Sequence, residues 1–242
     1  SLRWNQTDVT ETCAKFLGAK KGTAFSSFGK DVPEYEHAKR KSECNAAMIE
    51  SSPGSGKTRV ITQKIAYLIE QCGYAAHSIS AVTFTNKAAN EMRNRIASVL
   101  PAATRRGLKV ATFHTLGLSI LKRDAAICGL KRGFSIFDSE DCLQMLRGLL
   151  PPARASEREY LLQIQQQISH WKNELLAPDA VQASSADTPL RADAASIYPR
   201  YQQSLQAYNA VDFDDLIRLP ASLLSEHPDT LEYWQNKIRH LL

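Results

Sequence analysis

The sequence lacks three features that would assign it to a specialised class of protein. No apolar run approaches the ~20 residues that a membrane-spanning helix requires. The first residues do not show the positive charge followed by an apolar run that marks a secretion signal. The five cysteines are odd in number and include no CxxC pair, so neither a disulfide framework nor a zinc site is indicated. We therefore expect a cytoplasmic protein with free thiols and no membrane segment.

Glycine and proline are also scarce, with 11 and 10 residues in a chain of 242. The composition, 43% hydrophobic and 23% charged, is that of a globular protein large enough to bury a sizeable core. Between Lys57 and Arg132 there are thirteen Lys and Arg residues against three Asp and Glu, whereas the rest of the chain is net negative. This excess suits a polyanionic partner, although charge alone favours a solvated surface of helices.

The pattern of apolar residues predicts alternating strands and helices over residues 46–116. Short apolar or β-branched runs at 46–49, 79–84 and 108–113 are typical of strands. Apolar residues at helical spacing, from Val60 to Ile69, follow the first run, and a helix is predicted over 87–100 after the second, with Thr85 and Asn86 as its caps. Such alternation predicts an α/β fold with a parallel sheet.

From about Leu116 to Asn209 the pattern becomes mainly helical, with Trp171 inside one helix. A polar stretch rich in Ala, Ser and Asp, from Pro178 to Ser196, predicts a surface loop or linker. The segment 211–220 then begins a return to the α/β pattern. We interpret residues 117–205 as a helical insertion within the α/β domain.

The strongest chemical signal is the loop Gly54-Ser55-Gly56-Lys57-Thr58, between a predicted strand and a predicted helix. Glycines let backbone N–H groups converge on phosphate oxygens, and the N-terminus of the next helix faces the same anion. In such a loop Lys57 reaches the β- and γ-phosphates, and Thr58 places its hydroxyl on Mg²⁺. The flanking strand and helix disfavour the alternative, a glycine-rich turn without a ligand. The predicted nucleotide-binding residues are Ser51, Ser52, Pro53, Gly54, Ser55, Gly56, Lys57, Thr58 and Arg59, with Lys57 and Thr58 also predicted to act in catalysis.

Three further segments resemble motifs of one helicase family. TFTNKAANEMRNRI (83–96) looks like motif Ia of the UvrD/Rep/PcrA helicases of superfamily 1, and VATFHTLGLSIL (110–121) looks like their motif Ib. VDFDDLI (211–217) looks like the acidic segment that follows their helical insertion. FSIFDSEDCLQML (134–146) and ISHWKNELLAP (168–178) most resemble Rep-type members. The resemblance covers about residues 46–242, in the same order and spacing, and residues 1–45 do not share it.

The resemblance implies a fold, a set of domains and an activity. The fold is a partial RecA-like P-loop sheet, the first motor domain 1A, with an inserted and mainly helical subdomain 1B. Residues 1–45 are unassigned, 46–116 are the first part of 1A, 117–205 are 1B, and 206–242 return to 1A. The implied activity is 3′→5′ translocation driven by ATP and Mg²⁺, with single-stranded DNA and its junctions with duplex DNA as partners.

By the same resemblance, motifs Ia and Ib line the path of single-stranded DNA. Aromatic rings stack on bases irrespective of sequence, and polar side chains donate hydrogen bonds to phosphates. The predicted DNA-binding residues are Phe84, Thr85, Asn86, Thr112, Phe113, His114 and Thr115. Core packing is an alternative for the aromatic residues, above all Phe113, and a structural role is an alternative for His114. For Asp212, Asp214 and Asp215, capping and salt bridging are favoured over a metal or catalytic role.

The sequence departs from the family pattern in the nucleotide site. Ser51 stands where the loop usually begins with Gly, and Pro53 removes one N–H donor. No Gln occurs around His37 to Ser42, where the family reads adenine. In the family the segment YWQNKIRHLL (233–242) leads into an acidic DExQ motif, which this sequence does not contain. We therefore expect the chain to bind phosphates and to hydrolyse ATP negligibly on its own. The alternatives are another P-loop NTPase or kinase, and a module that binds DNA without catalysis.

Overall fold

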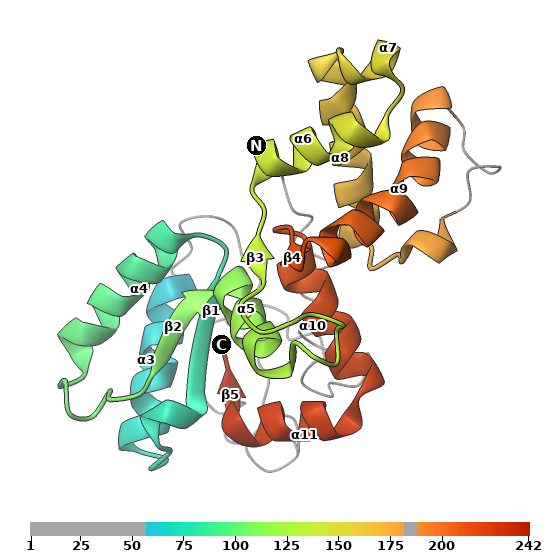
Figure 1. Cartoon of the computed structure of the whole chain (residues 1–242). Coiled ribbons are helices and arrows are strands. Elements are labelled where there is room, and N and C mark those ends of the chain that lie inside the picture. Colours follow the sequence, from blue (N-terminus) through green and yellow to red (C-terminus); the bar gives the residue numbers. More distant parts are fainter. Residues whose placement is uncertain (1–56, 182–187) are drawn as a thin grey trace. The chain divides into compact units, whose positions relative to one another are not determined.

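The structure, a computed structural model, describes residues 57–181 and 188–242, so the strand predicted at 46–49 lies outside the described residues. These residues form two compact units (Figure 1). The sheet unit comprises residues 57–116 and 227–242, and the helical unit comprises residues 117–226. Along the chain, the helical unit therefore falls between two segments of the sheet unit. Among the helices of the described residues, none combines the length and the apolar character that crossing a bilayer requires.

The sheet unit contains the parallel sheet that the sequence predicts. Its strands are β1 (Ile79–Thr83), β2 (Lys109–Thr112) and β5 (His240–Leu241), in the spatial order β2-β1-β5 (Figure 1). β1 runs parallel to both neighbours, and in its register with β2, Ser80 lies opposite Lys109 and Thr83 opposite Thr112. The expectation of an α/β fold is thus confirmed. The carboxyl ends of β1 and β2 lie at the same edge of the sheet.

Two helices of the sheet unit bury one face each against β1. These two helices are α3 (Lys57–Glu70) and α4 (Asn86–Val99). The unit also contains η1 (Ala76–Ser78), α11 (Pro228–Lys237) and the start of α5 (Phe113–Asp124), which continues into the helical unit. Ile65 and Leu68 of α3 and Ile96 of α4 belong to one buried cluster with Ile79 of β1. Val60 is 47% exposed, contrary to its predicted place on the apolar face, because it is one position away from the stripe of residues 61, 65 and 68.

The helical unit packs its helices around two stacked aromatic side chains. Its elements are β3 (Ser135–Ile136), α6 (Ser139–Leu149), α7 (Pro152–Ala155), α8 (Arg158–Asn173), η2 (Pro178–Ala180), α9 (Pro189–Ala207), β4 (Ala210–Val211) and α10 (Asp215–Glu226). Trp171 of α8 and Tyr198 of α9 are both buried, and their ring centroids lie 6.0 Å apart with the planes at 22°. Leu143, Leu161 and Leu205 from α6, α8 and α9 join the same core. β3 and β4 form a separate parallel pair.

The prediction of a loop over Pro178 to Ser196 is wrong for the second part of this stretch, which is helical. α9 begins at Pro189, and the Thr188 hydroxyl caps it by accepting a hydrogen bond from a backbone N–H of the first turn. Proline suits this position because the N–H that it lacks would have no partner inside the helix. Polar side chains of the stretch are used in packing, since Asp193 accepts a hydrogen bond from the hydroxyl of Tyr160. The composition resembles that of a loop because the buried face of this part of α9 consists largely of alanine.

Within the helical unit, α5 and α10 approach each other at Gly117. A Cβ placed on Gly117 would lie 1.8 Å from the carbonyl oxygen of Leu216 and 3.0 Å from its carbonyl carbon. The obstacle is backbone, so no change of side-chain rotamer relieves it. Leu121 of α5 and Leu216 of α10 are buried together beside this contact. Only a residue without a side chain allows the two helices this separation.

The substitution Gly117→Ala is expected to destabilise the chain by about 1–3 kcal/mol, the usual range for overpacking. The matched control is Gly148→Ala in α6, where an added Cβ meets nothing within 4 Å. That control is expected to be neutral or to stabilise by up to about 1 kcal/mol, because Ala is the better helix former. Urea unfolding followed by circular dichroism measures both. A Gly117→Ala chain as stable as the parent would contradict the close approach of α5 and α10.

Candidate functional site

The two turns that carry the predicted DNA-binding residues lie next to each other at one edge of the sheet. β1 ends at Thr83 and β2 ends at Thr112, and these two residues are paired in parallel register. Each strand passes almost directly into a helix, because α4 begins at Asn86 and α5 begins at Phe113. We call this edge, residues 84–86 and 112–115, the strand-end site. In open α/β sheets the carboxyl ends of the strands are the usual place for a ligand.

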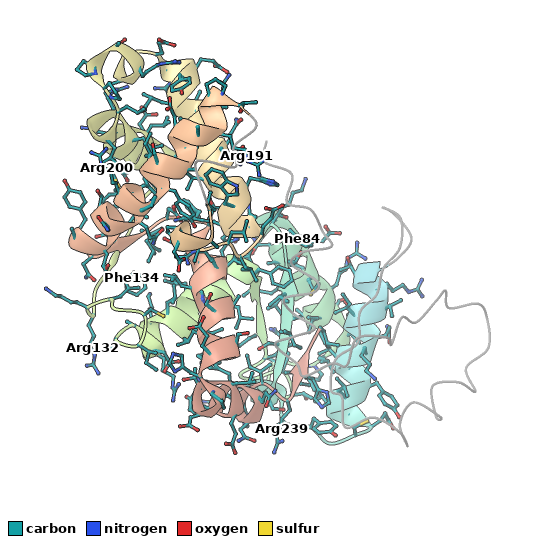
Figure 2. All side chains as sticks on the ribbon, turned by 90° about the vertical axis from the view of Figure 1, so that its right-hand side faces the viewer. Phe84, Arg132, Phe134, Arg191, Arg200 and Arg239 are labelled. Carbon is teal, nitrogen blue, oxygen red and sulfur yellow. The ribbon has the colours of Figure 1, made fainter. Side chains whose placement is uncertain are left out.

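The strand-end site is built around two aromatic rings. The ring centroids of Phe84 and Phe113 lie 5.1 Å apart, with the planes inclined at 49°. Phe84 is 45% exposed (Figure 2), whereas Phe113 is partly buried. A ring held against a second ring keeps a defined orientation, and one exposed to this extent contributes only part of its surface to a core. Core packing therefore accounts for Phe113 better than for Phe84, which presents part of its ring to solvent.

Both helices present their N-termini at the strand-end site. Thr85 is the N-cap of α4, and its hydroxyl accepts a hydrogen bond from the N–H of Ala88 at 3.1 Å, as the capping prediction requires. Asn86 is the first residue of the helix, and both side chains are exposed. Neither α4 nor α5 has an acidic residue in its first turn. No carboxylate of the first turn therefore offsets the partial positive charge of these helix ends, which favours an anion.

The polar residues of the second turn are tied to one another. Thr112 is buried, and its hydroxyl accepts a hydrogen bond from the N–H of Thr115 at 3.2 Å and lies 2.9 Å from the Thr115 hydroxyl. Thr112 thus fixes the start of α5, while Thr115 is exposed. Burial lowers the pKa of His114 below its ordinary value. Its imidazole is therefore neutral at pH 7 and can offer a hydrogen bond, but no charge, to a phosphate.

The predicted phosphate loop lies mainly outside the described residues, which include none of residues 51–56. α3 (Lys57–Glu70) confirms the helix predicted over Val60 to Ile69. Thr58 is half-buried in the first turn of α3, and Arg59 beside it is exposed. This first turn also contains no acidic residue, so the start of α3 suits a phosphate for the same reason as the starts of α4 and α5.

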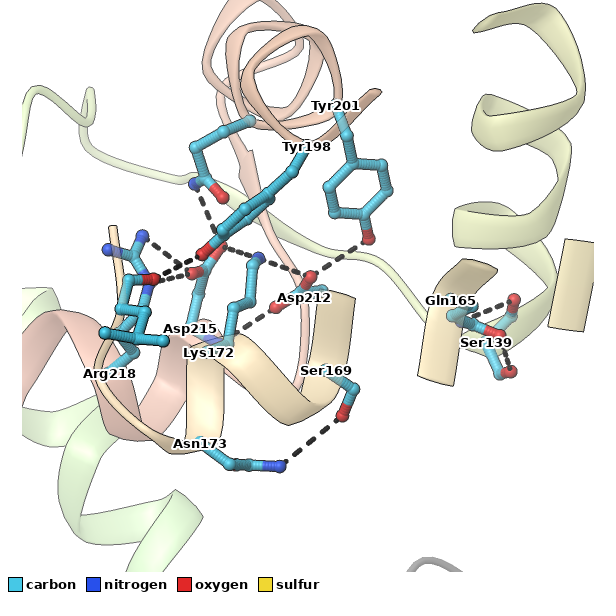
Figure 3. Close-up of polar contacts among 12 residues, drawn as sticks. Ser139, Gln165, Ser169, Lys172, Asn173, Tyr198, Tyr201, Asp212, Asp215 and Arg218 are labelled. Atoms are coloured by element: carbon cyan, nitrogen blue, oxygen red, sulfur yellow. Dashed lines mark hydrogen bonds and ion pairs between the residues drawn. The ribbon is translucent and has the colours of Figure 1, made fainter. Parts of the chain in front are cut away.

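The carboxylates of Asp212 and Asp215, in the acidic segment 211–217, bond to other side chains of the helical unit (Figure 3). Asp212 accepts hydrogen bonds from Lys172 Nζ at 2.6 Å and from the Tyr201 hydroxyl at 2.9 Å, and its other carboxylate oxygen accepts from the N–H of Asp215 at 2.9 Å. Asp215 pairs with Lys172 and Arg218, each at 3.0 Å, so the capping and salt bridging expected of this segment are present at Asp212 and Asp215. The part of the chain that the structure describes contains no group of three or more His, Cys, Asp or Glu placed to hold a metal ion. The sequence does not predict the role of Lys172 in these ion pairs. The one signal for it is a lysine at a position of α8 where the helical period predicts a buried, apolar residue.

Comparison with known proteins finds one family. The family model of the UvrD/REP helicase N-terminal domain matches residues 33–242, and so reaches into the stretch 1–45 that lacks a visible resemblance. The ATP-dependent DNA helicase Rep of Escherichia coli (strain K12) is 47% identical over 195 residues, which are 81% of this chain and 29% of the relative. The ATP-dependent DNA helicase PcrA of Leuconostoc citreum is 37% identical over 195 residues, 80% of this chain and 26% of the relative.

The chain therefore spans less than a third of the length of these relatives. The family match, in contrast, extends over most of the chain and includes the strand-end site, the acidic segment and the phosphate loop. On this ground the chain belongs to the family of the UvrD/REP helicase N-terminal domain.

Proposed function

We propose that this chain is the N-terminal part of an ATP-dependent DNA helicase that translocates 3′→5′ along single-stranded DNA. The observation that carries the proposal is the strand-end site, where the exposed ring of Phe84, backed by Phe113, stands beside two helix N-termini without acidic residues. A stacking ring combined with anion-binding donors suits single-stranded nucleic acid of any sequence. Relatives named as ATP-dependent DNA helicases support the same function. The polarity, and the binding of junctions with duplex DNA, follow from the family resemblance alone.

In this proposal Phe84 stacks on a base, and Phe113 holds the ring of Phe84 in place. The side chains that bond DNA phosphates are Thr85, Asn86, His114 and Thr115. Thr112 acts behind them, because its buried hydroxyl bonds both the N–H and the hydroxyl of Thr115. These side chains contact the faces of the bases and the phosphates, and they do not contact the base edges that carry the sequence information. The binding is therefore insensitive to DNA sequence.

We further propose a RecA-like motor domain made of residues 46–116 and 206–242, interrupted by a helical subdomain over residues 117–205. The parallel order β2-β1-β5 and the position of the helical unit between two segments of the sheet unit along the chain support this division. The compact helical unit extends to Glu226 and so includes α10, which the proposal assigns to the motor domain.

The nucleotide site of the proposal is the loop before α3. Lys57 binds the β- and γ-phosphates, and the Thr58 hydroxyl binds Mg²⁺, in the first turn of a helix that suits an anion. The remaining residues of this site are Ser51, Ser52, Pro53, Gly54, Ser55, Gly56 and Arg59. ATP with Mg²⁺ supplies the phosphoryl group whose hydrolysis drives movement of the intact protein.

The substitution Phe84→Ala is expected to weaken the binding of fluorescent oligo-dT by about 5- to 150-fold, because stacking on one base contributes ~1–3 kcal/mol. The matched control is Tyr74→Ala, another exposed aromatic residue of the sheet unit that precedes the amino end of β1. Tyr74 is 42% exposed, and its removal is expected to leave the affinity unchanged. Equal affinities of the Phe84→Ala chain and the parent would remove Phe84 from the DNA path.

The substitution Lys57→Ala is expected to weaken the binding of a fluorescent ATP analogue by about 10- to 150-fold, since a hydrogen bond to a charged group contributes ~1.5–3 kcal/mol. Lys64→Ala removes the same charge from a later turn of α3 and is the control. Fluorescence titration measures both affinities in the presence of Mg²⁺. A loss of the same size in both variants would indicate a general effect of charge rather than a phosphate contact of Lys57.

The 242-residue chain is expected to hydrolyse ATP at least about 10³-fold more slowly than the intact helicase, because its sequence contains no DExQ motif. By family resemblance, that motif supplies the carboxylate that binds Mg²⁺ and the glutamate that activates water. Phosphate release with and without oligo-dT measures the rate for both proteins. A comparable rate for the 242-residue chain would contradict the assignment. Failure of DNA to stimulate the intact protein would favour another class of P-loop enzyme.

A further inference from the structure

The helical unit carries a second pair of aromatic rings at its surface. Tyr208, at the end of α9, is 67% exposed, and its ring centroid lies 6.0 Å from that of Phe137, with the planes inclined at 38°. Phe137 follows β3 directly and is packed, partly buried, against the core of α6, α8 and α9. The arrangement repeats that of Phe84 and Phe113, in which a partly buried ring holds an exposed ring in a defined orientation.

The backbone fixes this ring pair from both sides. β3 pairs in parallel with β4, which begins two residues after Tyr208. The N–H of Phe137 donates to the carbonyl oxygen of Val211 at 2.8 Å. The backbone of Phe137 is therefore tied to the segment that follows Tyr208, and the two rings are held next to each other.

Asn209 brings two cations to the same place. Its φ of 50° lies in the left-handed region, and its side chain bonds the loop before β3. Asn209 Oδ1 accepts a hydrogen bond from the N–H of Lys131 at 2.8 Å, and Asn209 Nδ2 donates to the carbonyl oxygen of Lys131 at 3.4 Å. Because Asn209 directly follows Tyr208, these bonds hold the backbone of Lys131 close to the exposed ring. Lys131 and its neighbour Arg132 are both exposed, and Arg132 points away from the ribbon (Figure 2).

The two cations are not neutralised by carboxylates of the same surface. Residues 125–137 include Lys131 and Arg132 but no Asp or Glu, and residues 194–211, in the last part of α9 and β4, include no acidic residue either. Asp138, the next carboxylate along the chain, bonds two N–H groups of the first turn of α6. Among the described residues, no carboxylate forms an ion pair with either cation. Unmatched positive charge of this kind attracts a polyanion.

We propose that this surface, residues 131–132, 137 and 208, is a second contact for single-stranded nucleic acid, and we call it the Tyr208 patch. An unpaired base stacks on the exposed ring of Tyr208, which Phe137 holds in place. Lys131 and Arg132 bind the flanking phosphates. The contact lies on the helical unit and shares no residue with the strand-end site, so it extends the proposed function without depending on Phe84.

The chemistry of the Tyr208 patch favours a single strand over other polyanions. Each nucleotide of a single strand offers a phosphate and an open base face, which match the cations and the ring. In a duplex the bases are stacked on one another, so a side chain at the surface does not reach their faces. An acidic peptide satisfies the two cations but leaves the ring of Tyr208 without a planar partner.

Fluorescence titration of the 242-residue chain with oligo-dT tests the stacking contact. Tyr208→Ala is expected to weaken the binding by about 5- to 150-fold, which is the effect of one lost base stack. Tyr208→Phe is expected to keep the parent affinity, because the ring and not the hydroxyl makes the contact. Equal affinities of the Tyr208→Ala chain and the parent would overturn the proposal. An equal loss of affinity for polyglutamate in Tyr208→Ala would also overturn it, because the patch would then recognise charge alone.

The salt dependence of the same titration tests the phosphate contacts. Lys131→Ala and Arg132→Ala are each expected to reduce the slope of log affinity against log salt concentration by about 0.7, the value for one phosphate contact of a single strand. Arg147→Ala removes the same charge from an exposed position at the end of α6 and is expected to leave the slope unchanged. A slope that is the same in the parent and in the Lys131→Ala and Arg132→Ala chains would contradict the role of these cations.

Photocrosslinking of the parent chain requires no variant and separates the two sites. Oligo-dT that contains a photoreactive thymine analogue is expected to attach to a peptide with Tyr208 as well as to one with Phe84, as identified by mass spectrometry. Attachment at Phe84 alone would overturn the Tyr208 patch and leave the strand-end site intact. Attachment at Tyr208 alone would support the patch and count against Phe84. Attachment at neither residue would contradict both sites.

Discussion

The parallel pairing of β1 with β2 is the constraint on which the strand-end site depends. Because Thr83 lies opposite Thr112, the two strands end at the same level, and Phe84 meets Phe113 although the two residues belong to separate motifs. The same register sets the starts of α4 and α5 side by side. A shift of one residue in this pairing would turn every following side chain to the other face of the sheet. The site is therefore a property of backbone hydrogen bonds as much as of its own side chains.

The helical unit depends on a different kind of constraint. Its stacked aromatic core tolerates substitutions of similar volume, as cores generally do. The buried ion pairs of Lys172 and Arg218 with Asp212 and Asp215 do not, because removal of either cation leaves more negative than positive charge in the interior. Hydrophobic packing makes the unit compact, and the ion pairs specify which part of α8 meets the turn before α10. The acidic segment 211–217 accordingly stabilises the helical unit through the ion pairs of Asp212 and Asp215.

The sequence predicts what local patterns determine. β-branched runs predict β1 and β2, and Thr85 is predicted and confirmed as a cap, because these features depend on residues close together in the chain. The ion pair of Lys172 with Asp212 joins residues 40 positions apart, so no local pattern indicates it. The contrast between exposed Phe84 and partly buried Phe113 is equally beyond the sequence, since both rings follow strands of similar composition and only packing distinguishes them. The DNA and nucleotide contacts themselves stay predictions from motif resemblance.

The direct passage from β2 into α5 has a mechanical consequence. Thr112 is at once the last residue of a strand, paired with Thr83, and the residue whose hydroxyl bonds the first turn of the helix. No residue lies between the strand and the helix, because β2 ends at Thr112 and α5 begins at Phe113. The backbone at Phe113 is therefore held on both sides, by the strand pairing that ends at Thr112 and by the helix that begins at Phe113.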